Sequence, residues 1–148
     1  MSKIDPKSIF NSAESFYRGA KIILESAGKQ MFDPNSTTFQ LPILPCITNM
    51  AFSLELYLKC LFAIENVNIK RTHKIYDLYK LSKKTKSEIA KNILEYKEFE
   101  KNLEEISNAF EEWRYSYEKE KLSIDINKID KAIIVFHDMI IQIHPDWV

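Results

Sequence analysis

Residues 67–91 combine basic and aromatic side chains in a pattern that could bind a nucleic acid. Eight basic residues stand against two acidic ones there, a net charge of +6. Lysines would contact phosphates and tyrosines would stack on bases. Two other interpretations remain open: a solvated loop and helix face, or a patch that meets the acidic residues 92–125, net charge −5, of a second subunit. The candidate contacts are Lys74, Tyr76, Tyr79, Lys83, Lys84 and Lys86.

The cysteines and the last two histidines offer little further chemistry. Cys46 and Cys60 fall on one expected helix, where fourteen residues span roughly 21 Å, while a disulfide needs Cα atoms within about 7 Å. We therefore expect reduced, buried thiols. His137 and His144 are seven residues apart and could share a helix face, but no acidic or thiol ligands accompany them at a matching spacing. No metal or other cofactor is expected.

Three strings stand in a fixed order on a chain with helical periodicity along most of its length: AFSLELYLKCL at 51–61, THKIYDLY at 72–79 and FEEWRYSYE at 110–118. Together they resemble the HEPN family (higher eukaryotes and prokaryotes nucleotide-binding domain). That family shows an A-x-E-x-x-L-K-x-L-like helix, then an H-x-L or H-x-I-like entry to a short helix, then an arginine-bearing helix before a final one. The resemblance spans roughly residues 8–144.

This resemblance implies a helical bundle that often forms homodimers. Many members of the family are metal-independent RNA endonucleases of prokaryotic toxin–antitoxin or phage-defence systems. Their activity lies in an R-x(4–6)-H motif at the dimer interface. The arginine would hold the scissile phosphate, and the histidine would move a proton as a ribose 2′-hydroxyl attacks. An RNA or nucleotide ligand and a cognate antitoxin or other partner protein are the implied partners.

The arginine of this motif matches Arg114, but no histidine follows it at the spacing that the motif requires. Positions 119–121 are Lys119, Glu120 and Lys121. Tyr117 or Lys119 could move a proton only with a strongly shifted pKa, since phenols and amines titrate near ~10. His73 could reach the site from elsewhere in the fold or from a second subunit. The candidate catalytic residues are Arg114, Tyr117, Lys119 and His73, with Tyr115 and Glu118 as further RNA or nucleotide contacts.

Arg114 also has a possible structural role. Glu111 and Glu118 lie at i−3 and i+4, where they could form ion pairs along a helix. Glu55 sits between leucines on a core-forming helix, and a buried carboxylate needs a partner. An interhelical Glu55–Arg114 pair would suit both side chains. His73 follows Thr72 at an expected helix start, so a capping or loop role competes with catalysis.

Apolar residues recur at steps of three and four along most of the chain, which predicts amphipathic helices. Asp5 and Thr72 are expected helix caps, and Gly28 is an expected helix end. The fourth and fifth segments are either separate or continuous. The expected helices span residues 6–27, 45–61, 73–83, 87–96, 99–117 and 127–143.

The last of these helices is apolar around most of its circumference, which favours either the centre of the bundle or a contact with a second subunit. Four long helices with short connecting elements predict an all-α, HEPN-like antiparallel bundle that forms a single domain over residues 1–148. Glu55 and Lys59 are expected to pair at i,i+4 within the second helix.

The overall composition narrows the possible functions. Gly19 and Gly28 are the only glycines, so glycine-rich phosphate loops cannot form. The net charge is zero, which excludes a uniformly basic nucleic-acid or membrane binder. No leader and no membrane span is expected, so the cytoplasm is the default location. Three hypotheses remain: a toxin- or defence-type protein that binds or cleaves RNA around Arg114, a non-catalytic dimerisation, interaction or nucleotide-binding module, and a helical regulator of another family.

Overall fold

The computed structural model describes residues 4–30, 43–68, 72–113 and 125–148, and all regular structure in these ranges is helical. The all-α class expected from the sequence is confirmed. A single 3₁₀ turn, η2, follows the last helix. The helices are α1 (Pro6–Gln30), α2 (Ile43–Ile64), α3 (Ile75–Leu81), α4 (Lys83–Asn92), α5 (Tyr96–Trp113) and α6 (Ile126–Ile143), and η2 covers Pro145–Trp147.

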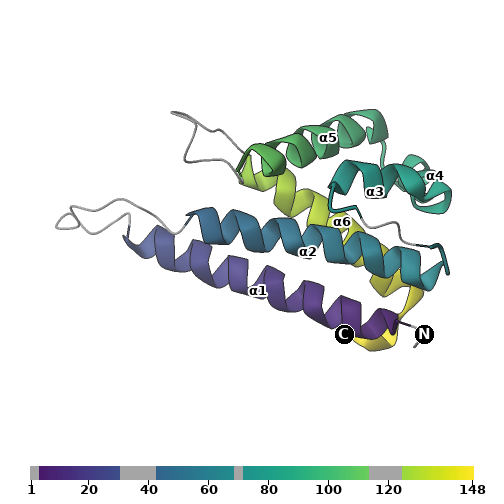
Figure 1. Cartoon of the computed structure of the whole chain (residues 1–148), viewed down its shortest axis with the longest axis horizontal. Helices are drawn as coiled ribbons and strands as arrows, with labels where there is room; N and C mark the ends of the chain where they lie inside the picture. The colour runs from purple at the N-terminus through teal and green to yellow at the C-terminus, as the bar shows by residue number, and fades with distance from the viewer. Residues whose placement is uncertain (1–3, 31–42, 69–71, 114–124) are drawn as a thin grey trace.

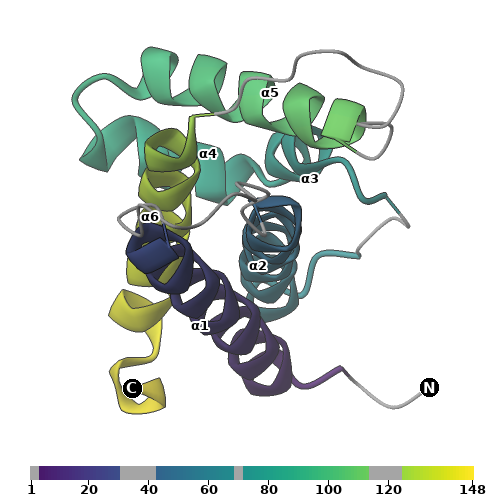
Figure 2. The same ribbon diagram turned by 90° about the vertical axis from the view of Figure 1, so that its left-hand side faces the viewer.

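The long helices α1 and α2 lie side by side and run in opposite directions (Figure 1). Helix α6 packs against α2, and its axis is inclined to that of α2. Figure 2 shows α5 lying across the top of the molecule, where it contacts α3, α4 and α6. The fold therefore has a layer of α1, α2 and α6 beneath a layer of α3, α4 and α5.

The centre of this fold is α2, which touches α1, α3, α5 and α6. Its core side chains include Leu54, Tyr57, Leu58 and Leu61, all fully buried. The sequence pattern instead favours the last helix as the central one or as a subunit contact. Helix α6 buries one stripe, leaves Ile134 exposed on another face and leaves Ile143 exposed at the C-terminal end of the stripe. The stripe consists of Ile129, Ala132, Ile133, Phe136 and Ile140.

The helix ends follow local capping chemistry, and one of three sequence expectations holds. Asp5 caps α1 as expected, because its carboxylate accepts hydrogen bonds from the amides of Lys7 and Ser8 at 3.1 and 3.3 Å. Gly28 does not end α1, which continues to Gln30. Thr72 does not cap α3, because its hydroxyl accepts a bond from the Lys74 amide at 3.2 Å and the helix begins at Ile75.

Helix α4 begins earlier than the apolar periodicity indicates. Ser82 caps it, accepting a hydrogen bond from the Thr85 amide at 3.0 Å, and the helix ends at Asn92. Its first turn is mostly lysine, so no apolar stripe marks it in the sequence. Residues 93–95 separate α4 from α5, so the expected segment 87–96 was wrong and the two helices are not continuous.

One stretch among the described residues, Leu44–Ile64, is long and apolar enough to cross a membrane. More than half of this stretch is buried within the protein. The central helix of a packed core meets the same criteria of length and composition, and α2 is that helix here. This finding is weak evidence for a membrane span.

Candidate site between α2 and the C-terminal end of α5

A small cavity of about 110 Å³ lies between α2, the segment before α3 and the last turn of α5. A second cavity of about 250 Å³ shares His73, Ile75 and Phe110 with it. The walls of the first cavity are mainly apolar, with a carboxylate and an imidazole set into them. The residues that line the second cavity are mostly polar, since Thr72, Lys74, Ser107 and Glu111 line it together with His73. The lining residues of the first cavity are Ile47, Thr48, Ala51, Phe52, Glu55, His73, Ile75, Phe110 and Trp113.

The carboxylate is Glu55, which is only 7% exposed. Glu55 follows Leu54 on α2. The helical periodicity that buries Leu54 and Leu58 in the core places the adjacent Glu55 side chain next to the segment before α3. Its Oε1 atom pairs with Lys59 one turn along the helix and lies 2.9 Å from Nδ1 of His73. A buried carboxylate needs such partners to offset its desolvation. The expected Glu55–Lys59 pair is thus confirmed.

The His73 side chain is 67% exposed although one of its ring nitrogens is held by Glu55. Within the described ranges, the ring nitrogens have a polar partner only at Nδ1, so no described residue occupies Nε2. The ring stands at the junction of both cavities. Sequence reasoning names His73 as a candidate but misses its partner, because eighteen residues separate it from Glu55 and no periodic pattern links them.

The five candidates clustered around the motif arginine lie outside the described residues: Arg114, Tyr115, Tyr117, Glu118 and Lys119. The proposed Glu55–Arg114 pair is therefore untested. The last described residue of α5 is Trp113, which lines the smaller cavity and immediately precedes Arg114 in the sequence. The indole Nε1 of Trp113 is buried and has no hydrogen-bond partner among the described residues.

The candidate lysines divide into two groups. Lys74 borders the larger cavity and pairs with Glu111 of α5 at 3.4 Å. Lys83, Lys84 and Lys86 lie in the first turns of α4, beyond the far end of α3, so the fold does not bring them to the cavities. No ion pair within the described ranges involves these three lysines.

Of the two tyrosines expected to stack on bases, Tyr79 cannot do so. It is fully buried, and its hydroxyl donates to Glu100 at 2.7 Å. Burial, and then the bond to Glu100, raise the pKa of Tyr79. Tyr76 is half-buried; its ring lies 6.2 Å from that of Tyr79, and the ammonium of Lys80 lies 5.0 Å from its centre. The expectation for Tyr79 was wrong because Tyr79 belongs to the buried face of α3 and not to its exposed face.

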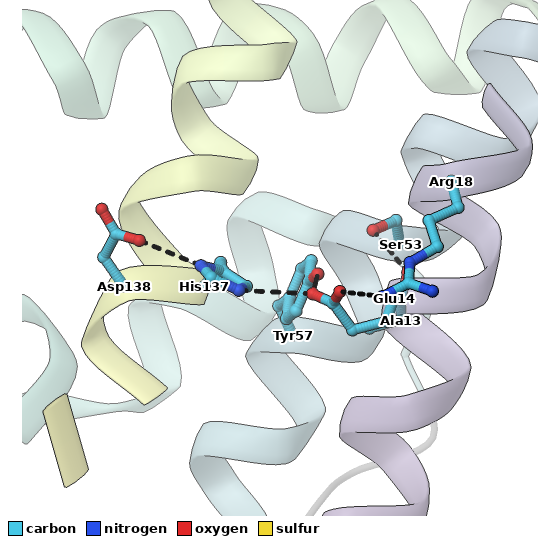
Figure 3. Close-up of polar contacts among 7 residues, drawn as sticks. All are labelled: Ala13, Glu14, Arg18, Ser53, Tyr57, His137 and Asp138. Atoms are coloured by element: carbon cyan, nitrogen blue, oxygen red, sulfur yellow. Dashed lines mark hydrogen bonds and ion pairs between the residues drawn. The ribbon is translucent and has the colours of Figure 1, made fainter. Parts of the chain in front are cut away.

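A second polar cluster, which the sequence does not reveal, joins α1, α2 and α6 (Figure 3). The buried Tyr57 hydroxyl donates to Glu14, and Nε2 of His137 lies 3.4 Å from the same carboxylate oxygen. On the other side, Nδ1 of His137 lies 2.9 Å from Asp138. Burial, and then the bond to Glu14, raise the pKa of Tyr57. Because every member already has a partner, this cluster fastens three helices together.

The described residues contain no group of three His, Cys, Asp or Glu side chains placed to hold a metal ion. His144 stacks on Trp147 with ring centres 4.2 Å apart, while His137 belongs to the cluster with Glu14. His137 and His144, which are seven residues apart, therefore make separate contacts.

Comparison with known proteins identifies the family. The family model described as HEPN domain matches residues 45–140, well over half of the chain, and this range contains most of α2, all of α3 to α5 and most of α6. It includes the whole set of side chains that line the smaller cavity. No curated protein and no solved structure matches the chain. With its all-helical fold and this match, the chain belongs to the HEPN-domain family.

Proposed function

We propose that this protein binds RNA at the cavity between α2 and α5, with Arg114 as the main phosphate contact. Membership of the HEPN family indicates a nucleotide-binding or ribonuclease-like module. The observation that carries the finer proposal is the Glu55–His73 pair, set in a cavity that Trp113 lines directly before Arg114. A polar pair of this kind in an otherwise apolar hollow is typical of a ligand site.

The charges near the cavity suit a polyanion. Lys59 pairs with Glu55, so the single buried carboxylate does not leave a net negative site. Lys74 stands at the rim of the larger cavity, where it pairs with Glu111. An arginine fork beside these groups would bind a phosphate through two parallel N–H donors. Tyr115, Tyr117, Glu118 and Lys119 follow Arg114 in sequence and are proposed as further contacts.

The alternative is a non-catalytic module in which Arg114 pairs with Glu55. The contacts of Glu55 favour the first proposal, because this carboxylate already has Lys59 and His73 as partners. An arginine as a third partner would add desolvation cost with little further gain. In the first proposal, Lys83, Lys84 and Lys86 form a separate, weaker contact with the RNA backbone where the RNA extends past α3 to α4.

We further propose that the protein acts as a homodimer and as a toxin- or defence-type protein. Dimers are common among HEPN domains. Phe16 of α1 and Phe52 of α2 form an exposed aromatic pair, and Phe52 also lines the smaller cavity. A second copy on this face would lie beside the RNA site. Induced expression in bacteria should slow growth, and Arg114→Ala should remove that effect; equal growth of both strains would contradict the toxin role.

The RNA proposal is tested by fluorescence anisotropy with a labelled, mixed-sequence single-stranded RNA over a series of salt concentrations. Arg114→Ala should weaken binding by about 10-fold or more, since a charge-assisted hydrogen bond contributes ~1.5–3 kcal/mol. The triple variant Lys83→Ala, Lys84→Ala, Lys86→Ala should reduce the salt slope by about 0.7 for each phosphate that a lysine neutralises in the wild type.

The control for the triple variant removes three exposed lysines at other positions: Lys97 and Lys101 at the start of α5, and Lys131 of α6. This control changes the net charge by the same amount. A difference between the two triple variants therefore reports the positions of the lysines and not the net charge of the protein. A wild-type protein that does not bind RNA would overturn the proposed function. An Arg114→Ala variant that binds as tightly as the wild type would remove Arg114 from the site.

A further inference from the structure

We propose that His73, oriented by Glu55, is the group that takes the proton from a ribose 2′-hydroxyl and so replaces the histidine missing from the R-x(4–6)-H motif. This inference rests on the RNA binding proposed above. It deepens that proposal by assigning cleavage of the bound RNA to a pair of side chains that come from α2 and from the segment before α3.

The geometry is that of an imidazole held at one nitrogen and open at the other. Nδ1 of His73 lies 2.9 Å from Oε1 of a carboxylate that is only 7% exposed. When Nδ1–H donates to Glu55, the tautomer is set and the lone pair lies on Nε2. A carboxylate behind an imidazole also stabilises the imidazolium that forms when the ring takes a proton.

The charged groups around His73 come from three elements. Glu55 and Lys59 face it from α2, Lys74 is its neighbour in the chain, and Glu111 of α5 pairs with Lys74. Lys59 shares the carboxylate oxygen that His73 contacts, so the negative charge next to the ring is partly balanced. The ring is thus held in place at the junction of the two cavities, one of which Trp113 lines directly before Arg114.

The other two histidines of the chain are committed elsewhere. His137 has carboxylates at both ring nitrogens, from Glu14 and Asp138. His144 stacks on Trp147 beside the C-terminal turn and lines a different cavity. Neither lines the cavity that adjoins Trp113, which leaves His73 as the imidazole placed for chemistry there.

The step that we assign to His73 conserves atoms and charge. The 2′-oxygen forms a bond to phosphorus as its proton passes to Nε2, and the bond from phosphorus to the 5′-oxygen breaks. The departing 5′-oxygen takes a proton from water, and His73 later returns its proton to solvent. The products are a 2′,3′-cyclic phosphate and a 5′-hydroxyl, with no metal ion or other co-reactant consumed.

The test measures cleavage and binding of the same RNA in the presence of a metal chelator. The wild type should yield 2′,3′-cyclic phosphate ends. His73→Gln should cut at least about 100-fold more slowly while its Kd for RNA changes less than about twofold, because general base catalysis contributes ~10²–10⁴-fold. His144→Gln is the matched control and should cut like the wild type. Free imidazole should restore part of the activity of His73→Ala.

Glu55→Gln separates positioning from packing. Without the carboxylate that accepts from Nδ1–H, the ring is less often held with Nε2 toward the RNA, so kcat should fall while KM for RNA stays near the wild-type value. Circular dichroism checks that this variant is folded. A purely structural Glu55 would lower the amount of folded protein but leave the kcat of that fraction unchanged, which would overturn the positioning role.

The possible failures are distinguishable. A wild type that binds RNA but leaves it intact would overturn this inference and leave the proposed RNA binding standing. A wild type that neither binds nor cuts would overturn both. Cleavage by His73→Gln at the wild-type rate, or an equal fall in rate for His73→Gln and His144→Gln, would also contradict the role of His73.

Discussion

At the scale of single residues, burial decides what the titratable groups of this protein can do. Glu55 is buried and paired, so it can hold His73 in position. The two thiols are buried and free, as expected, and each donates to a carbonyl of α1: Cys46 to Ala20 at 3.5 Å and Cys60 to Pro6 at 3.3 Å. The thiols therefore serve packing between α1 and α2.

The buried Cys60 thiol should make the protein less stable in alkali. Burial, and then the charge of Asp5, raise its pKa from the ordinary 9.0 to about 12. The unfolded thiol ionises first, so the unfolded state binds fewer protons and the free energy of unfolding falls as pH rises from 9.0 to about 12. The slope reaches at most ~1.4 kcal/mol per pH unit for one group.

Urea denaturation over a pH series measures this effect. Cys60→Ala should show a shallower fall in stability just above pH 9.0 than the wild type, whatever the cost of the smaller side chain. The buried phenols of Tyr57 and Tyr79 act in the same direction, but only once unfolded phenols begin to ionise near pH 10.0. Parallel pH curves for wild type and Cys60→Ala would contradict the assignment.

At the scale of elements, the apolar stripes predict most of the buried faces, although Phe16 of α1 and Ile143 of α6 are exposed. Several helix ends differ from the prediction. The stripe of α5 that contains Phe99, Leu103 and Ile106 is buried as expected. The start of α4 escapes prediction because it depends on a cap, not on a stripe. Ser82 is almost fully buried and contacts Glu65, just beyond the end of α2, at 2.9 Å as well as Thr85 of its own helix. This serine thus joins the α3–α4 junction to the end of α2.

Ser82→Ala should lower the free energy of unfolding by about 1–2 kcal/mol, because it removes a helix cap and the hydrogen bond to Glu65. Ser87→Ala is the matched control: the same change in the same helix, at an exposed position, should stay within about 0.5 kcal/mol of wild type. Chemical denaturation measures both variants. Equal values for the two would show that the cap does not stabilise the junction.

At the scale of the whole molecule, the fold places the basic and acidic segments of the sequence next to each other. Helix α4 carries four lysines and one glutamate, and it packs against α5, which carries six glutamates and two lysines. Charge complementarity between these segments is therefore available within one chain. These charges do not require a second copy to balance them, and the exposed aromatic pair of Phe16 and Phe52 is the better candidate for a contact between copies.

The double variant Phe16→Asp, Phe52→Asp should convert a dimer of this protein to a monomer. The two rings lie 5.5 Å apart and are 38% and 45% exposed, so two buried carboxylates would make a subunit contact there unfavourable. Sedimentation or light scattering measures the mass. Leu94→Asp, at a side chain 98% exposed between α4 and α5, should leave the mass unchanged. A monomeric wild type would contradict the proposal.

Some features of this protein follow from the sequence by itself. Helical periodicity is a local property, so the all-α class, the buried face of each long helix and the three HEPN-like strings are readable along the chain. Pairings between distant residues are not. Glu55 meets His73, and Glu14 meets both Tyr57 and His137, only because packing brings their helices together. The tertiary structure also decided that α2 is central, since several helices have apolar faces and only their joint packing selects one to be enclosed.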